Sequence, residues 1–169
     1  MKSYEEQVIE LERKYDNRLK QALARFDRVV LPKDGLYVSP VKVNEAAADL
    51  ILKVEDLTRR AYGSGYKLGA KAAQRDLAND GIPLRISVEV NEPPADYFEA
   101  RQRTISTIET AVSAFNQGVG GKNESNQIRS SALSCLSTHI NRAWTDAYLE
   151  LIEELKQWSL KSLEQLHKG

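Results

Sequence analysis

Apolar residues recur at spacings of three and four along most of this chain, and this period constrains the fold more than any other feature. A helix gathers such residues on one face, and the intervening positions here are mostly polar. The period therefore predicts an all-α protein: four to five mostly long amphipathic helices in an elongated bundle. We expect the 169 residues to form a single helical domain, 1–169.

The first predicted helix runs from Ser3 to about Leu31. Ser3 and Glu6 are spaced as a capping box, in which each side chain satisfies a free backbone N–H at the helix start. Pro32 and Gly35 end the helix. Polar residues surround its apolar stripe almost everywhere, so the helix needs a partner surface, and helix 3–31 is a candidate for a partly independent element.

A second helix is predicted from an N-cap at Asn44 to about Ala78. Its middle contains glycines, each of which costs about 1 kcal/mol relative to alanine in a helix. Four small residues spaced four apart form a smooth ridge there, namely Ala61, Gly65, Gly69 and Ala73. The ridge predicts close helix–helix packing, and a kink or break near Gly63 is the alternative.

Glycine and proline residues divide the chain after the second helix into a turn, a short extended segment and two further helices. Residues 79–83 have turn chemistry, and the alternation of Ile86, Val88 and Val90 predicts a short extended segment near 86–90. The prolines at 93 and 94 open a third helix that stops at Gly118. The last helix, 123–167, is either one continuous helix of about 60 Å or two helices with a bend near 137–138. Helices this long in a short chain favour an oligomer.

The composition of the chain limits the classes of function that it can have. Lys+Arg and Asp+Glu both number 24, and this zero net charge argues against a dedicated nucleic-acid binder. Residues 1–85 carry three more basic than acidic side chains and the rest carry three fewer, so the two halves could dock head to tail, within or between chains. Ordinary solvated faces of mixed charge are the alternative, which we favour. A lone Cys135, an acidic N-terminus without a signal sequence and no apolar run near 20 residues predict a cytoplasmic or virion protein without a membrane segment.

Catalytic and metal-binding patterns are sparse. Cys135 and His139 share a helix face, and a catalytic Cys–His pair is weighed against a buried cysteine beside a hydrogen-bonded histidine, which we favour. With one Cys and two His, no zinc set is complete. The glycines at 63–69 follow a helical pattern and so do not match a dinucleotide loop. We expect no enzyme activity and no cofactor.

Two basic stretches, 13–28 and 53–75, support a rival interpretation. Four aromatic residues lie within them, and phosphate contacts with base stacking would use these residues, namely Tyr15, Phe26, Tyr62 and Tyr66. The alternative is a solvated face whose aromatics point into the core. An acidic cluster of opposite sign could meet these faces in an assembly; it comprises Asp146, Glu150, Glu153 and Glu154.

Three segments carry a family resemblance. Residues 60–70 hold tyrosines and glycines in the manner of a Tyr-x-x-Gly helix, a glycine-containing link joins 108 to 128, and 140–148 is similar to an Ile-Ala-Arg-Thr-Glu segment. Over about 55–150 the chain resembles bacteriophage head morphogenesis (minor head) proteins. That resemblance implies a virion or procapsid component near the portal, which works through oligomeric contacts without catalysis.

These observations predict a structural or assembly protein acting through helix–helix contacts. The expected interaction residues are the ridge Ala61, Gly65, Gly69 and Ala73 together with Trp144 and Trp158. The expected partners are further copies of the chain or other assembly proteins, and nucleic acid is an unfavoured alternative. The rival function is a helical nucleic-acid-associated subunit of a larger complex.

Overall fold

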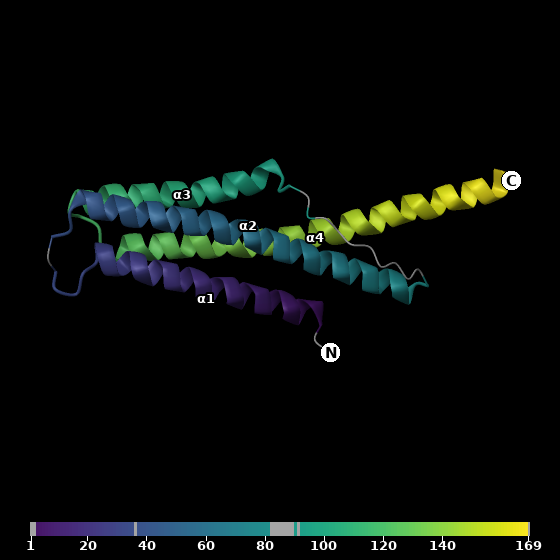
Figure 1. The fold of residues 1–169 in the computed structure, drawn as a ribbon, viewed down its shortest axis with the longest axis horizontal. Helices are drawn as coiled ribbons and strands as arrows, with labels where there is room; N and C mark the ends of the chain where they lie inside the picture. Colours follow the sequence, from purple (N-terminus) through teal and green to yellow (C-terminus); the bar gives the residue numbers. More distant parts are fainter. Residues whose placement is uncertain (1–2, 36, 82–89, 91, 169) are drawn as a thin grey trace.

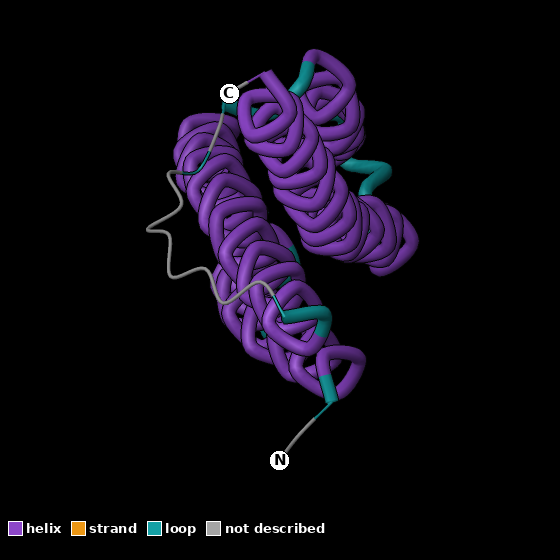
Figure 2. Tube along the Cα trace, turned by 90° about the vertical axis from the view of Figure 1, so that its right-hand side faces the viewer, coloured by secondary structure: helices purple, strands orange, loops and turns teal. Residues whose placement is uncertain are grey.

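The protein is a bundle of long helices in this computed structural model, which describes residues 3–35, 37–81, 90 and 92–168. The side chains of Leu155, Lys156 and 158–168 lie outside that description. The described residues form four helices and no strand: α1 (Tyr4–Val30), α2 (Pro40–Asn79), α3 (Ala95–Asn116) and α4 (Lys122–Lys168). Figure 2, from the side, shows that the described chain consists of helices and loops. The all-α prediction is confirmed, and a fifth helix is not found among these residues.

Serine caps begin the first two helices. The Ser3 hydroxyl accepts a hydrogen bond from the Glu6 amide at 3.2 Å, as the capping box predicted. The predicted N-cap of the second helix at Asn44 is wrong, because the observed N-cap lies five residues earlier, where the Ser39 hydroxyl accepts a hydrogen bond from the Lys42 amide. Pro40 suits that first turn, since its missing N–H would have had no helical partner.

The long helices are continuous. α2 passes through Gly63 without a break, so of the predicted kink or break near Gly63 the break is wrong. α4 likewise passes through 137–138, where a bend would have produced a fifth helix. The Ser137 hydroxyl donates to Glu12 on α1 at 3.4 Å and so does not compete with the helix backbone. The predicted extended segment near 86–90 lies outside the described residues except at Val90.

The core lies where α1, α2 and α4 meet, and α3 closes one side of it (Figure 1). α1 runs antiparallel to α2, whereas α2 and α4 run in the same direction. All four helices contribute fully buried side chains, among them Leu19, Val54, Leu57, Ile108, Ile128 and Ile140. Phe26 of α1 meets Phe115 of α3 edge to face at 6.1 Å. α1 therefore shares the common core, and its independent folding stays a prediction.

The end of α4 extends past the rest of the bundle. Leu151 is buried against Leu77 near the end of α2, and Ile152 packs at the edge of that cluster. From Glu153 to Lys168 the helix continues for about 24 Å at 1.5 Å per residue. Figure 1 shows this stretch, in yellow, reaching beyond the end of α2. None of the helices, within the residues described, is long and apolar enough to cross a membrane.

Candidate functional site

The small-residue ridge of α2 lies against the backbone of α4. A Cβ built on Gly65 would stand 2.5 Å from the Ile140 carbonyl oxygen and 3.1 Å from the Ile140 Cα. A Cβ on Gly69 would overlap the Trp144 carbonyl oxygen and stand 2.9 Å from the Trp144 Cα. Neither position has room for any side chain, so glycine is what allows the two helices to approach.

The ridge is therefore an intramolecular contact. Ala61 and Ala73 are fully buried, in the clusters that contain Ile140 and Leu151 of α4. The close packing predicted for Ala61, Gly65, Gly69 and Ala73 exists, but the neighbouring backbone belongs to the same chain. A surface buried in this way is not open to a partner in this conformation, so any contact with another chain would use a different surface.

The two tryptophans differ in what the structure describes. Trp144 is half-buried and stacks on Tyr148, with ring centroids 5.5 Å apart and planes within 3°. The Tyr148 hydroxyl donates to Asp76 of α2 at 2.5 Å, which fixes this aromatic pair against α2. The buried Trp144 Nε1 has no hydrogen-bond partner among the described residues. The side chain of Trp158 lies outside the described part.

An aromatic cluster joins α2, α3 and α4, and the sequence analysis did not identify it. Tyr62 meets Tyr97 edge to face at 4.6 Å, and Tyr97 meets His139 in the same way at 4.5 Å. Tyr97 is 2% exposed, yet its hydroxyl has no partner within the described residues. The only signal in the sequence is the four-residue spacing of Tyr62 and Tyr66, which also fits the predicted alternative of a stacking surface for bases.

Charged side chains surround this cluster. Arg142 forms an ion pair with Asp96 at the start of α3 and lies 5.1 Å from the Tyr97 ring centroid. The Tyr66 hydroxyl donates to Glu150 at 2.9 Å. Burial, helped by that carboxylate, raises the pKa of Tyr66 far above its usual value. Burial also raises the pKa of Asp146. The tyrosines thus stay protonated at neutral pH and act as packing and hydrogen-bonding groups.

The Cys135–His139 pair lies buried between α3 and α4. His139 Nδ1 is 2.8 Å from the Cys135 carbonyl oxygen and 3.6 Å from the Cys135 sulfur. Burial raises the pKa of the Cys135 thiol and lowers the pKa of His139. Both shifts favour the neutral forms, whereas a nucleophilic pair needs a thiolate. The geometry matches the packing interpretation. No group of three or more His, Cys, Asp or Glu in the described residues is arranged to hold a metal.

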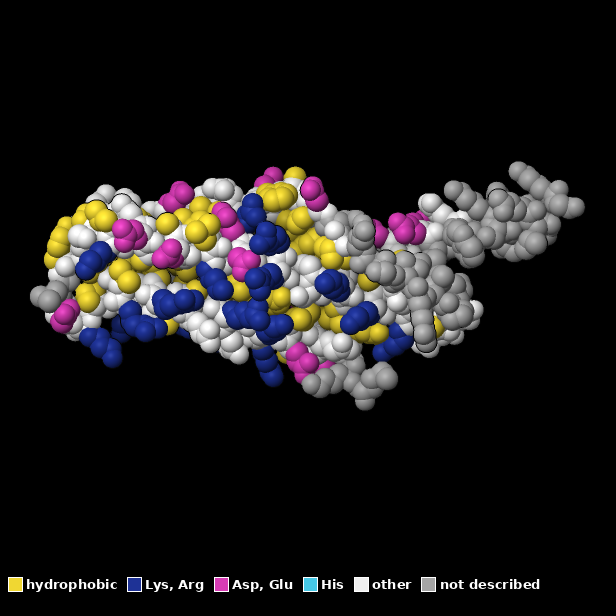
Figure 3. Space-filling view, viewed as in Figure 1, with side chains coloured by type: hydrophobic (Ala, Val, Ile, Leu, Met, Phe, Trp, Pro, Cys, Tyr) yellow, Lys and Arg dark blue, Asp and Glu magenta, His cyan; other side chains and the backbone are white. Residues whose placement is uncertain are grey.

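A band of basic side chains covers the seam between α1 and α2 (Figure 3). At one end a groove of about 540 Å³ is lined by Arg25, Lys42 and Lys53, with Glu45 and Asp49 between them. At the other end a groove of about 400 Å³ is lined by three lysines and one acidic residue. We call this second groove the lysine groove. Its lining is Gln7, Glu10, Leu11, Lys14, Ser64, Lys67, Leu68 and Lys71.

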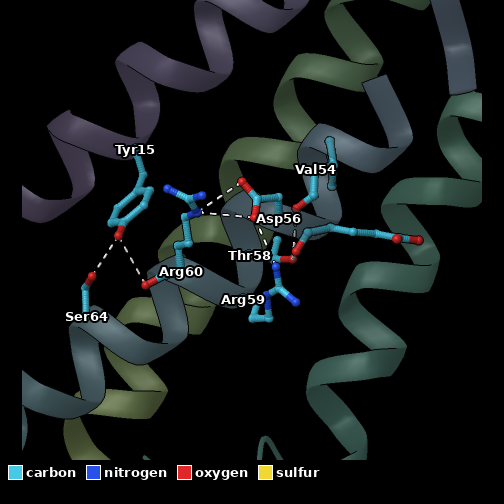
Figure 4. Close-up of polar contacts among 8 residues, drawn as sticks. Tyr15, Val54, Asp56, Thr58, Arg59, Arg60 and Ser64 are labelled. Atoms are coloured by element: carbon cyan, nitrogen blue, oxygen red, sulfur yellow. Dashed lines mark hydrogen bonds and ion pairs between the residues drawn. The ribbon is translucent and has the colours of Figure 1, made fainter. Parts of the chain in front are cut away.

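Between the grooves the polar groups satisfy one another (Figure 4). The Tyr15 hydroxyl lies 2.7 Å from the Ser64 hydroxyl and donates to the Arg60 carbonyl at 3.1 Å. Asp56 pairs with both Arg59 and Arg60, and these bonds keep its carboxyl pKa below the usual value although burial opposes them. The aromatics considered for base stacking are not available in this conformation: Tyr15, Phe26, Tyr62 and Tyr66 are all buried.

Comparison with known proteins gives no relative. No protein-family model, no curated protein and no solved structure matches this chain.

Proposed function

We propose that this chain is a helical structural protein that works by assembling with further copies of itself or with other assembly proteins. The observation that carries the proposal is the end of α4, which continues beyond the end of α2 and past Leu151 and Ile152, the last residues of the described core clusters. The resemblance of the sequence to phage minor head proteins would place such an assembly in a bacteriophage head, near the portal.

The α4 end calls for a partner on physical grounds. Most helices in proteins gain their stability by packing an apolar face against a neighbouring surface rather than from helix propensity alone. Beyond Ile152 the α4 sequence still contains large apolar residues at short intervals: Leu155, Trp158, Leu160, Leu163 and Leu166. A contact with another chain would bury them and stabilise the helix. We propose Trp158 as the central residue of that contact, since tryptophan is enriched at interaction hot spots.

The alternative function, a nucleic-acid-associated subunit, has one favourable observation, the basic band over α1 and α2. Two observations weigh against it. The chain has no net positive charge, and the aromatics within the basic stretches are buried. Self-assembly requires neither a net positive charge nor exposed aromatic residues.

Sedimentation velocity on the full chain tests the proposal over a wide concentration range. We expect the wild type to self-associate and Trp158→Glu to shift it to monomers, because a charge would have to be buried in the contact. Leu52→Glu is the matched control, since Leu52 is 64% exposed on α2 of the bundle. It should leave association unchanged. A wild type that stays monomeric throughout, or equal effects of the two variants, would refute the proposal.

A further inference from the structure

The lysine groove has the features of a site for an amphipathic acidic helix. Its three lysines are exposed and come from both walls, Lys14 from α1 and Lys67 and Lys71 from α2. The single acidic residue in the lining is Glu10, so the groove carries a net charge of +2. Buried Leu68 and half-buried Leu11 contribute apolar surface between the charges. A helix with acidic residues beside an apolar stripe matches both properties.

Basic groups extend the positive field of this groove. The Arg75 guanidinium lies 4.4 Å from the centroid of the Tyr4 ring, whose hydroxyl donates to the Lys71 carbonyl. Arg18 lies 5.7 Å from the centroid of the Tyr15 ring. A partner that approaches the groove therefore meets more positive charge than the three lysines alone.

The chain itself carries a segment of the complementary kind. Glu153 and Glu154 are exposed at the point where α4 leaves the bundle, and the apolar residues of the α4 end follow them in sequence. The segment cannot fold back onto the groove of its own molecule, because α4 is one continuous helix that runs away from the bundle (Figure 1). Contact between this segment and a lysine groove therefore requires two molecules.

We propose that the lysine groove binds the acidic start of the α4 end, at Glu153 and Glu154, of a second copy of this chain. The inference rests on the proposed function and specifies its partner surface. The two surfaces in the contact differ, so each copy offers a groove and a helix end. Such a head-to-tail contact builds a ring if the rotation closes and a filament if it does not. The apolar residues of the helix end supply affinity, and the charges select the register and speed association.

Charge reversal on each side tests the contact in the full-length chain. Lys67→Glu/Lys71→Glu changes the groove, and Glu153→Lys/Glu154→Lys changes the helix end. We expect each double variant to weaken self-association about tenfold or more, since several charge pairs become repulsive. All four positions are exposed, so the variants should fold, and circular dichroism checks this. The matched control is Arg25→Glu/Lys42→Glu, which makes the same charge change in the other groove and should leave the dissociation constant unchanged.

The decisive readout is whether mixing the two double variants restores self-association. An equimolar mixture of the two double variants should associate as the wild type does, because each groove then meets a helix end of opposite charge. If groove reversal leaves the dissociation constant of an associating wild type unchanged, or if mixing fails to restore association, the inference is wrong while the proposed function stands. A wild type that never associates refutes both. Binding of labelled single-stranded DNA that depends on Lys67 and Lys71, with self-association unaffected by their reversal, would assign the groove to nucleic acid and overturn the inference.

Discussion

Gly65 of α2 lies directly against the backbone of Ile140 in α4, so close that a Cβ on Gly65 would stand 2.5 Å from the Ile140 carbonyl oxygen. One turn further along both helices, Gly69 faces Trp144 in the same way. The equal step of four residues keeps the two parallel helices in register at their closest approach. The glycines lower the helix propensity of α2, but they allow its backbone to pack directly against α4 in the centre of the bundle.

Gly65→Ala and Gly69→Ala should each lower the free energy of unfolding. The new methyl group meets rigid backbone, and overpacking of this kind costs about 1–3 kcal/mol, only partly offset by a gain of about 0.8 kcal/mol in helix propensity. Gly63→Ala is the control on the same helix, because a Cβ there meets no atom within 4 Å. It should stabilise by about 0.5–1 kcal/mol. Urea unfolding measures the free energy of unfolding of all three variants. If all three are stabilised, Gly65 and Gly69 do not pack directly against the α4 backbone.

Tyr97→Phe should be neutral or stabilise the protein by about 1 kcal/mol, because the Tyr97 hydroxyl is buried with no hydrogen-bond partner among the described residues. Tyr15→Phe provides the contrast, since the Tyr15 hydroxyl contacts both Ser64 and the Arg60 carbonyl. Its loss should cost about 1 kcal/mol. Thermal unfolding of both variants tests this prediction. If Tyr97→Phe destabilises the protein more than Tyr15→Phe does, the Tyr97 hydroxyl has a hydrogen-bond partner after all.

Stability should fall as the pH drops below about 6.5, the usual pKa of histidine. Burial lowers the pKa of folded His139, so the unfolded chain takes up a proton that the folded chain resists. The neighbouring charges are mixed: Arg101 and Arg142 oppose protonation and Asp96 favours it. Raised pKa values such as that of Asp146 act in the opposite direction at more acidic pH.

The His139 contribution can be isolated by substitution. His139→Gln should flatten the dependence of unfolding free energy on pH between about 7 and 5.5, whatever its effect on absolute stability. Denaturant unfolding at several pH values gives the slope. An unchanged slope in the variant would mean that His139 titrates normally in the folded protein.

Cys135 should react slowly with thiol reagents in the native state and rapidly after unfolding, because it is 4% exposed and burial raises its thiol pKa. Cys135→Ser should cost about 1–3 kcal/mol through burial of a hydroxyl and leave assembly intact. Rapid native-state labelling, or a folded serine variant that no longer assembles, would point to a functional thiol.

Some features were predictable because they depend on local sequence. The 3–4 apolar period predicted an all-α bundle, Ser3 and Glu6 marked the start of α1, and Gly118, with φ +77°, follows the end of α3 as expected. The start of α2 was misplaced although a local signal marks it, because Ser39 caps the helix and Pro40 occupies its first turn. Asn44 instead lies inside α2, where its side chain accepts a hydrogen bond from Asn116, 72 residues away in sequence.

The sequence by itself determined that the chain would form long amphipathic helices and that the Gly65–Gly69 ridge would receive another backbone, because helical period and side-chain volume are local properties. Only the tertiary structure decided that this backbone is α4 of the same chain and that Tyr62, Tyr66 and Tyr97 meet in one cluster. It also decided that the lysines of α1 and α2 share one groove. Period shows which face of a helix is apolar, but the partner of that face depends on the packing of all four helices together.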